Sequence, residues 1–373
     1  MEAEAEAFMF TSKHDSQQLL KILKALKQAS HDLQKNPNSE KIDGDRTFSC
    51  SPVIKALLEL QHESDSILST DPHLTALSTH LTALKTLNHN SCTNPQRHHG
   101  LKSFLIRRDN SHEISKLAGS IESEIQAWID REFVKTLAQT LRRADETREE
   151  VLIDLIQQFE ERIGTGFDLE LQNSILRSKV FTKLESILCG SKFSKNVREA
   201  SAFAIAELIR FNKDVFVGQV LISKTVCALI SLASVRSIQI LCTLIRSIKS
   251  PIVDEIVSNG KIPKLIGFLT SDDFSIRTTA MECVMEIGYF GRKEAIEAML
   301  EEDLVKKLVE LQRSDLFASC VARFAVQFEV GEGLRRRERR ALKQEVLQRV
   351  REAHVCEAEA ATIVAEVLWG ATP

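Results

Sequence analysis

The sequence is poor in Tyr and Trp, which favour strands, and in Gly and Pro, which are common in the turns between strands. Tyr occurs once and Trp twice in 373 residues, and there are only 14 Gly and 7 Pro. Strand-forming runs bounded by turn residues are therefore hard to find, whereas Leu, Ile, Glu and Lys are abundant. The composition predicts an all-α protein.

Paired cysteine motifs are also missing, since no two cysteines stand in a CxxC arrangement. Several cysteines lie inside apolar helical stretches, where a free thiol behaves as a small hydrophobic side chain. We therefore expect reduced thiols and a cytoplasmic and/or nuclear location. The eight are Cys50, Cys92, Cys189, Cys227, Cys242, Cys283, Cys320 and Cys356.

Long uncharged apolar runs are absent as well. No window approaches the 18 or so apolar residues typical of a membrane helix, so no membrane span is expected. The acidic start, Met1 to Phe8, lacks the basic and apolar regions of a secretory signal. The net charge of −3 and pI of about 6.4 give no reason to expect a nucleic-acid partner for the whole chain.

The sequence contains none of the common catalytic or cofactor motifs. There is no GxSxG, no Walker A, no HExxH and no GxGxxG between a strand and a helix. His89, Cys92, His98 and His99 fit no standard zinc spacing, and a polar loop explains them better. We expect no enzyme activity, no cofactor, no metal and no small-molecule ligand.

A shift in composition divides the chain. Nine of ten histidines precede residue 113, which predicts an N-terminal helical region with flexible loops over residues 1–145. Helical repeats with C-terminal capping helices are predicted over 146–373. The helices predicted in the first part are Ser16–His31, Pro52–Leu68, Pro72–Leu87 and Ser111–Leu141, with loops at Gln34–Ser49 and Asn88–Gly100.

Three similar segments recur in the second part. Val197–Ala202, Val235–Ile240 and Ile276–Met281 each open with a β-branched residue and Arg, and then continue as an apolar helical segment. They start 38 and then 41 residues apart. A repeat of this length predicts a stack of helical units.

The third unit carries a family resemblance. Gly260-Lys261-Ile262-Pro263-Lys264-Leu265-Ile266 is similar to the start of an armadillo repeat, G-x-I-P-x-L-V, and Ile276–Ile287 resembles its long helix. The resemblance covers about residues 150–373. It implies an N-terminal helical bundle followed by a right-handed armadillo-type α-solenoid. HEAT repeats are the rival interpretation, but the Gly-x-Ile-Pro start favours armadillo.

The N-terminal helices and repeats together resemble plant armadillo superfamily proteins related to U-box ubiquitin ligases and to the yeast vacuolar armadillo protein. A U-box would show a Cys-Pro-Ile start and an Asp-Pro-Val stretch, and the sequence has neither. No residues are therefore visible that would recruit a ubiquitin-conjugating enzyme.

The resemblance implies that the long helices line a binding groove. Residues four apart share a helix face, and armadillo import adaptors place Trp and Asn at such positions to hold an extended basic peptide. This sequence has no such Trp-Asn series, so a different partner is expected. The matching pairs are Phe203/Glu207, Leu241/Ile245, Glu282/Glu286 and Arg323/Gln327, and Arg198, Arg236 and Arg277 open the repeated segments.

Each groove residue has two interpretations. Glu282 and Glu286 would attract a Lys or Arg of a partner, and Phe203 would anchor an apolar side chain. Alternatively, these residues belong to solvated helix faces.

The strongest run of charge lies near the C-terminus. Arg335, Arg336, Arg337, Arg339 and Arg340 would form a nuclear localisation signal or a phosphate-binding patch. The apolar residues that follow at helical spacing favour the exposed face of a helix instead.

These observations favour a non-enzymatic scaffold that binds another protein or a peptide through the groove. The alternative is an accessory, substrate-recruiting factor in ubiquitin ligation that has no U-box of its own. The third hypothesis is an enzyme hidden in the N-terminal bundle.

Overall fold

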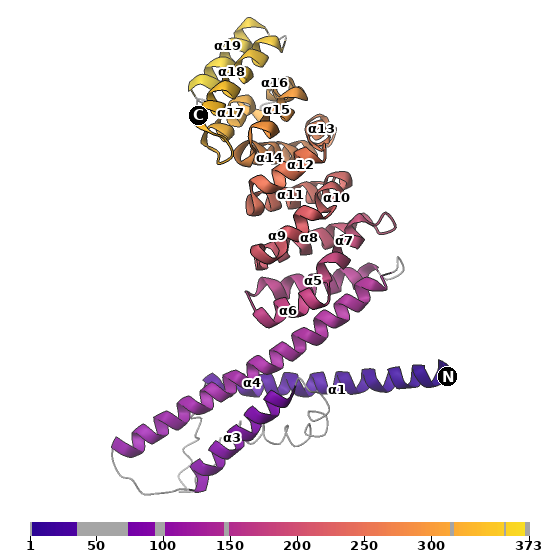
Figure 1. The fold of residues 1–373 in the computed structure, drawn as a ribbon, viewed down its shortest axis with the longest axis vertical. Helices are drawn as coiled ribbons and strands as arrows, with labels where there is room; N and C mark the ends of the chain where they lie inside the picture. Colours follow the sequence, from indigo (N-terminus) through magenta and orange to yellow (C-terminus); the bar gives the residue numbers. More distant parts are fainter. Residues whose placement is uncertain are drawn as a thin grey trace. The chain divides into compact units, whose positions relative to one another are not determined.

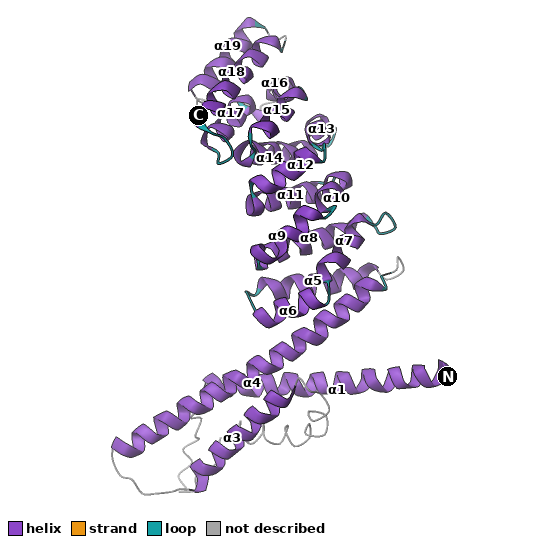
Figure 2. Ribbon diagram, in the orientation of Figure 1, coloured by secondary structure: helices purple, strands orange, loops and turns teal. Residues whose placement is uncertain are grey.

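The computed structural model describes residues 2–35, 74–93, 101–144, 149–313, 317–353 and 356–369. Every regular element within these ranges is a helix (Figures 1 and 2), which confirms the all-α prediction. The chain forms two compact units. The first comprises Met1–Lys135 with Glu170–Ser174, and the second comprises Thr136–Leu169 with Ile175–Pro373.

The described part of the first unit contains three long helices, α1 (Glu2–Lys35), α3 (Thr75–Thr93) and α4 (Leu101–Arg142). Each contributes leucines or isoleucines at helical spacing to one shared apolar core. A polar contact also links α1 to α4: Lys27 Nζ donates a hydrogen bond to Gln126 Oε1 (2.6 Å). The core residues are Leu19, Leu23, Leu26, Leu33, Leu74, Leu77, Leu81, Leu84, Ile114, Ala118, Ile121, Ile125 and Trp128.

These helices are longer than the sequence predicted. Residues 88–93, predicted as loop, belong to α3, whose last described residue is Thr93. The helix predicted at Ser111 begins at Leu101, and the one predicted at Ser16 extends from Glu2 to Lys35. The helix predicted at Pro52–Leu68 lies outside the described residues.

The helices that follow α4 are shorter and form an array, which makes up the second unit except for Glu170–Ser174 of α6. The long helices α5, α8, α11, α14 and α17 contact one another in that order, and α19 contacts α17, so they form one layer. The shorter helices connect and cover them. The bounds are α5 Glu149–Gly164, α6 Leu169–Arg177, α7 Val180–Cys189, α8 Lys195–Phe211, α9 Lys213–Ile222, α10 Thr225–Leu232, α11 Val235–Ile248, α12 Ser250–Ser258, α13 Ile262–Gly267, α14 Phe274–Phe290, α15 Lys293–Glu301, α16 Leu304–Gln312, α17 Cys320–Val330, α18 Arg336–Glu352 and α19 Glu357–Trp369.

Three helices make each repeating unit, as α9–α11, α12–α14 and α15–α17 show. Gly260 adopts φ 60° before α13, and Asp303, which lies 43 residues later, adopts φ 58° before α16. The glycine of the Gly-x-Ile-Pro motif is thus used for its left-handed conformation, which lets the chain turn sharply between helices. The predicted helical solenoid is confirmed.

The segment from Leu171 to Leu188 does not form a single helix. The chain forms α6 and α7, which are separated at Lys179 in the left-handed conformation (φ 52°). This short polar break contains no Pro or Gly, so no turn residue marks it in the sequence. In the last repeat, α17 begins at Cys320.

Candidate interaction surface on the long helices

Each long helix leaves one stripe of side chains outside the array core. On α8 this stripe includes Phe203 and Glu207, and on α14 it includes Glu282 and Glu286, while the residues between them are buried. The packing of neighbouring long helices places the stripes side by side. We call the surface the long-helix face, defined by Phe203, Glu207, Thr243, Ser247, Glu282, Glu286, Arg323 and Gln327.

The pair predicted on α11 is wrong. Leu241 and Ile245 are fully buried, and Thr243 and Ser247 take the outward positions. The cause is the start of the helix: Val197 and Ile276 stand three residues after the N-caps Ser194 and Asp273, whereas Val235 directly follows its N-cap, Ser234. When the three helices are aligned on the Val-Arg or Ile-Arg pattern, the positions of α11 are therefore two residues out of register with those of α8 and α14.

The N-cap of α11 is well determined by local hydrogen bonds. Ser234 and Ser237 form a reciprocal capping box, in which the N–H of Ser237 donates to Ser234 Oγ (3.0 Å) and the N–H of Ser234 donates to Ser237 Oγ (3.1 Å). This arrangement satisfies two amides that the first turn of a helix leaves unpaired. It fixes the register of α11.

Two of the three repeat arginines serve the fold. Arg198 Nε donates to the Leu188 carbonyl (2.8 Å), and Arg277 Nη1 donates to the Ser271 carbonyl (2.6 Å). Both stand four residues after their N-cap, where the side chain reaches back to the end of the preceding helix. Arg236 stands only two residues after its N-cap and is exposed. Of the three, Arg236 is the one available to a partner.

Glu160 on α5 is an acidic residue of this layer that the sequence patterns do not single out. Its Oε1 is buried and has no hydrogen-bond partner among the residues that the structure describes. Burial, and next the negative charge of Glu207, raise the pKa of the Glu160 carboxyl to about 7, against the opposing effect of Arg236. The only sequence signal is its place on an amphipathic helix, which does not identify it.

The predicted acidic pair on α14 is partly neutralised. Arg246 Nε on α11 lies 2.7 Å from Glu286 Oε1, and this hydrogen bond is the main cause that raises the pKa of the Arg246 guanidinium. Glu207 is likewise paired with Arg210 on its own helix (2.9 Å). Glu282 is exposed and forms no ion pair among the described residues. Glu282 is therefore the freer carboxylate of the pair.

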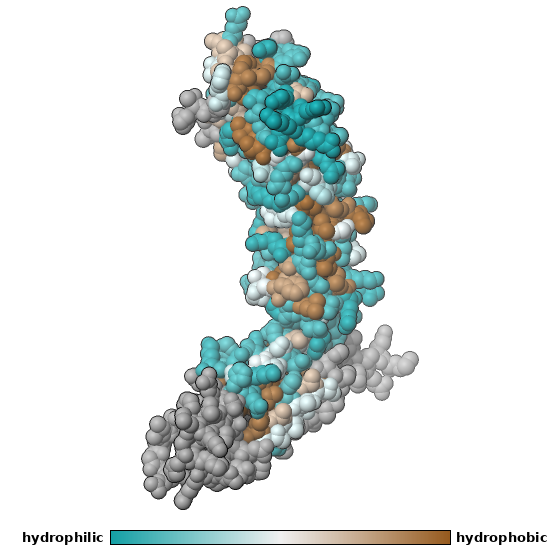
Figure 3. Space-filling model, turned by 60° about the vertical axis from the view of Figure 1, so that its left-hand side comes forward, coloured by the Kyte–Doolittle hydropathy of each residue, from teal (hydrophilic) through white to brown (hydrophobic). Residues whose placement is uncertain are grey.

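The remaining positions differ from helix to helix. Phe203 on α8 is 42% exposed. On α17, Arg323 is exposed and Gln327 is half-buried, with Val326 and Val330 exposed beside them. Figure 3 shows apolar patches separated by hydrophilic surface on the side that it presents. The long-helix face thus combines aromatic, acidic, basic and apolar groups without a repeating order.

The five arginines of the predicted basic patch lie in two different environments. Arg335, Arg336, Arg337 and Arg340 are exposed at the start of α18, as the helix-face interpretation predicted. Arg339 is different, because Nη1 donates to the Glu329 carbonyl (2.6 Å), Nη2 to the Gly331 carbonyl (2.7 Å) and Nε to the Leu334 carbonyl (3.1 Å). Its charge is used inside the fold.

Other kinds of site find little support among the described residues. No group of three or more His, Cys, Asp or Glu is arranged to hold a metal ion there. The side chains of His89 and Cys92, and residues 98 and 99, lie outside the described part of the chain. Six cysteines of the described ranges are free thiols: Cys189, Cys227, Cys242, Cys283, Cys320 and Cys356.

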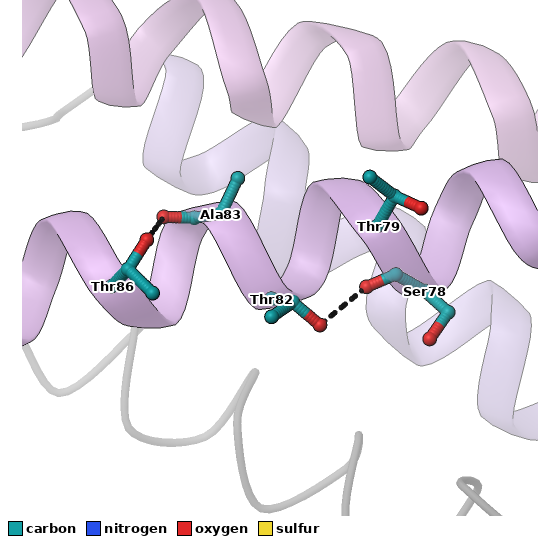
Figure 4. A pocket seen from close by; sticks show the side chains of 5 residues that line it. All are labelled: Ser78, Thr79, Thr82, Ala83 and Thr86. Carbon is teal, nitrogen blue, oxygen red and sulfur yellow. Dashed lines mark hydrogen bonds between the residues drawn. The ribbon is translucent and has the colours of Figure 1, made fainter.

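A shallow pocket lies along α3 in the first unit. Ser78, Thr79, Thr82, Ala83 and Thr86 line it, and all of them belong to that one helix (Figure 4). The hydroxyl of Thr82 donates to the Ser78 carbonyl and that of Thr86 to the Ala83 carbonyl, both at 2.8 Å. These hydroxyls are already engaged by their own helix, so the pocket offers few free polar groups.

No single described helix is long and apolar enough to cross a membrane. Helices α9 and α10 pass that test only as a pair, and they are bent by 70° relative to each other.

Comparisons with known proteins give structural matches alone. No family model and no curated protein matches the chain. A designed armadillo repeat protein is 15% identical, covers 62% of this chain and 98% of its own length, and has a TM-score of 0.44. A second one, solved in complex with the peptide (KR)4, is 16% identical over 62% of this chain and 98% of its own, with a TM-score of 0.45.

The match to an engineered protein extends over 94% of this chain and 87% of that protein. The two are 16% identical, and the TM-score is 0.45. These scores are low, so the fold assignment rests on the helices themselves. The described chain contains an all-α solenoid built from three-helix units.

Proposed function

We propose that this chain is a protein-binding scaffold, without catalytic activity, that contacts its partner through the long-helix face. The observation that supports the proposal is the series of outward stripes on four consecutive packed helices, α8, α11, α14 and α17. The fold needs the inward sides of these helices for its core, whereas Phe203, Glu282 and Arg323 have no structural task that the described contacts reveal.

The chemistry of the face favours one irregular partner. Equivalent positions carry Phe203, Thr243, Glu282 and Arg323, so consecutive repeats offer an aromatic ring, a hydroxyl, a carboxylate and a guanidinium. A peptide with a repeating sequence would need equivalent groups at equivalent places. The proposed partner therefore has an apolar or aromatic side chain for Phe203 and a basic side chain for Glu282.

The location of the protein and the kinds of partner that it excludes stay predictions. Residence in the cytoplasm or nucleus belongs to the proposal, as does the exclusion of nucleic acids and small molecules as partners of this face. No observation favours the ubiquitin-ligation alternative over the simpler scaffold, and the likeness to plant U-box-related proteins rests on the sequence resemblance alone.

The test compares partners captured by the full chain and by two variants with matched changes. Phe203→Ser combined with Glu282→Lys alters the long-helix face without breaking the Arg246–Glu286 pair. Ile222→Ser replaces an apolar residue that is 91% exposed at the end of α9 and serves as the control. Proximity labelling in cells, followed by quantitative mass spectrometry, measures the partners of each.

We expect the double variant to lose specific partners that the wild-type chain and the Ile222→Ser variant both retain. Circular dichroism should show the same helical content for all three proteins, because the substituted side chains are exposed. Identical partner sets for the double variant and the wild type would refute the proposed role of the face.

A further inference from the structure

Four guanidinium groups at the start of α18 have no task inside the fold. Arg335, Arg336, Arg337 and Arg340, which we call the arginine cluster, are exposed and form no ion pair among the described residues. Figure 3 shows strongly hydrophilic side chains near the C-terminal end of the array. The long-helix face contains none of these residues.

Three of the other four cations of α18 are engaged, and the fourth, Arg351, lies exposed in the last turn of the helix. Lys343 Nζ pairs with Glu329 Oε1 (2.8 Å), and Arg349 binds both Glu345 (2.9 Å) and the Leu300 carbonyl (2.7 Å). Arg339 satisfies three carbonyls near the end of α17. The cluster is therefore a surplus of positive charge and not a general property of the helix.

The position of this surplus opposes helix stability. Arg335 is the N-cap of α18, and Arg336 and Arg337 are its first residues, where the helix dipole already places partial positive charge. The neighbouring carboxylate, Glu338, accepts a hydrogen bond from the Arg335 N–H (2.8 Å). Exposed side chains gain no packing energy, so the fold receives nothing in return. Such local conflicts are expected at functional sites.

We propose that the arginine cluster is a docking site for an acidic segment of a partner protein, rich in Asp and Glu. A guanidinium presents its donors in a planar fork that matches a carboxylate and forms two parallel hydrogen bonds with it. Binding of carboxylates also removes the repulsion between the arginines and the positive end of α18.

The surroundings favour a short acidic peptide over a nucleic acid. The helix has no aromatic residue on which a base could stack. The apolar side of α18, formed by Leu342, Val346 and Val350, is buried and unavailable for insertion into a lipid surface.

The experiment measures binding of a fluorescein-labelled decaglutamate peptide to the full chain by fluorescence anisotropy at low ionic strength. One variant changes Arg335, Arg336, Arg337 and Arg340 to Gln. The control changes four exposed lysines elsewhere in the array, Lys195, Lys213, Lys224 and Lys264, to Gln, and so removes the same net charge. We expect about tenfold weaker binding by the arginine variant and less than about twofold by the control, because local charge sets the interaction.

Equal weakening in the two variants would mean that only net charge matters, and this result would overturn the proposal. Undiminished binding by the arginine variant would overturn it as well. A labelled deca-thymidine strand tests the other class of partner, and tighter arginine-dependent binding of DNA than of decaglutamate would also refute the acidic-segment assignment.

Loss of folding does not mimic the expected result. Removing cations from the first turn of α18 should leave the thermal midpoint unchanged or raise it. The milder variant Arg336→Gln with Arg337→Gln provides a second point, with an expected loss of binding between those of the wild type and the fourfold variant. A graded loss at constant helical content supports the proposal, whereas wild-type binding by the milder variant together with unfolding of the fourfold variant would refute it.

Discussion

Arg339 shows how one side chain can close the end of a helix. The last turn of a helix leaves carbonyl groups without partners. At the end of α17, the Arg339 guanidinium donates hydrogen bonds to the Glu329 and Gly331 carbonyls. Arg198 plays a comparable part for the Leu188 carbonyl of α7. Arginine at such places acts as a C-terminal cap supplied by the following helix.

We predict that Arg339→Gln lowers the free energy of unfolding by about 2–3 kcal/mol, because charged hydrogen bonds to buried carbonyls are lost. The next residue offers a matched control. Arg340 is exposed, so Arg340→Gln should change stability by less than about 0.5 kcal/mol. Urea unfolding followed by circular dichroism measures both, and equal stability of the two variants would show that the three carbonyl contacts contribute little.

Glu160 makes stability depend on pH. Its pKa is raised to about 7 from an ordinary 4.5, chiefly by burial and then by Glu207. Between these two values the folded protein binds more protons than the unfolded chain, so this group's contribution to stability decreases as pH rises from about 4.5 to about 7. At higher pH the penalty for the buried charge is complete.

Glu160→Gln should therefore stabilise the protein at pH 8 by an amount on the order of 1 kcal/mol, because solvent screening of this partly exposed group reduces the full effect of the pKa shift. At pH 4.5 the variant and the wild type should be nearly equal. Denaturant titrations at both pH values check this, with Glu161→Gln as the exposed control on the same helix. A stabilisation of equal size at both pH values would exclude titration of Glu160 as its cause.

At the scale of the element, helix starts decide which residues face outward. The Val-Arg pattern located three long helices correctly, yet on α11 it misplaced Leu241 and Ile245, which are buried. A capping box of two serines starts this helix two residues later relative to the pattern. Hydrophobic spacing identifies helices, but the local hydrogen bonds that set their register depend on atoms that spacing does not describe.

The loop between α17 and α18 rests against the end of α14. The N–H groups of Glu332 and Gly333 donate to the Tyr289 carbonyl (2.8 and 3.3 Å), and a Cβ on Gly333 would overlap the backbone carbonyl of Gly291. A side chain at this position would force the two backbones apart. The close approach of consecutive repeats therefore requires glycine here.

We predict that Gly333→Ala destabilises the protein by about 1–3 kcal/mol or more through overpacking. Gly218 supplies the opposite case, since it lies inside α9 and a Cβ added there would meet no neighbouring side chain or helix within 4 Å. Gly218→Ala should stabilise by about 0.5–1 kcal/mol because alanine favours the helix. Thermal melts of the two variants should move in opposite directions, and a harmless Gly333→Ala would disprove the close contact.

For the whole molecule, the sequence predicted the class of fold better than the binding surface. Period and apolar spacing revealed the helical array, because each repeat must bury one face against its neighbours. The surface needed tertiary information: Glu286 is neutralised by Arg246 from another helix, and Glu160 becomes notable through its burial and the charge of Glu207. Partners that come from other repeats are invisible to a pattern along one helix.

The chain has two separate cores, and we predict that a cavity in one of them leaves the stability of the other unchanged. Leu23 is fully buried in the core shared by α1, α3 and α4, and Ile245 is fully buried in the array. Leu23→Ala should destabilise the first unit by about 2–5 kcal/mol, the usual result of a buried cavity. Hydrogen exchange read by mass spectrometry should then accelerate in α1 and α3 but not in α11 and α14.

Ile245→Ala is the reciprocal variant, and faster exchange is expected in α8, α11 and α14, because a repeat is stabilised by its immediate neighbours. Amides of α1 and α3 should keep their protection. Accelerated exchange along the entire chain in either variant would instead mean that both cores unfold as one cooperative unit, and the partner-binding face would then depend on the N-terminal helices for its stability.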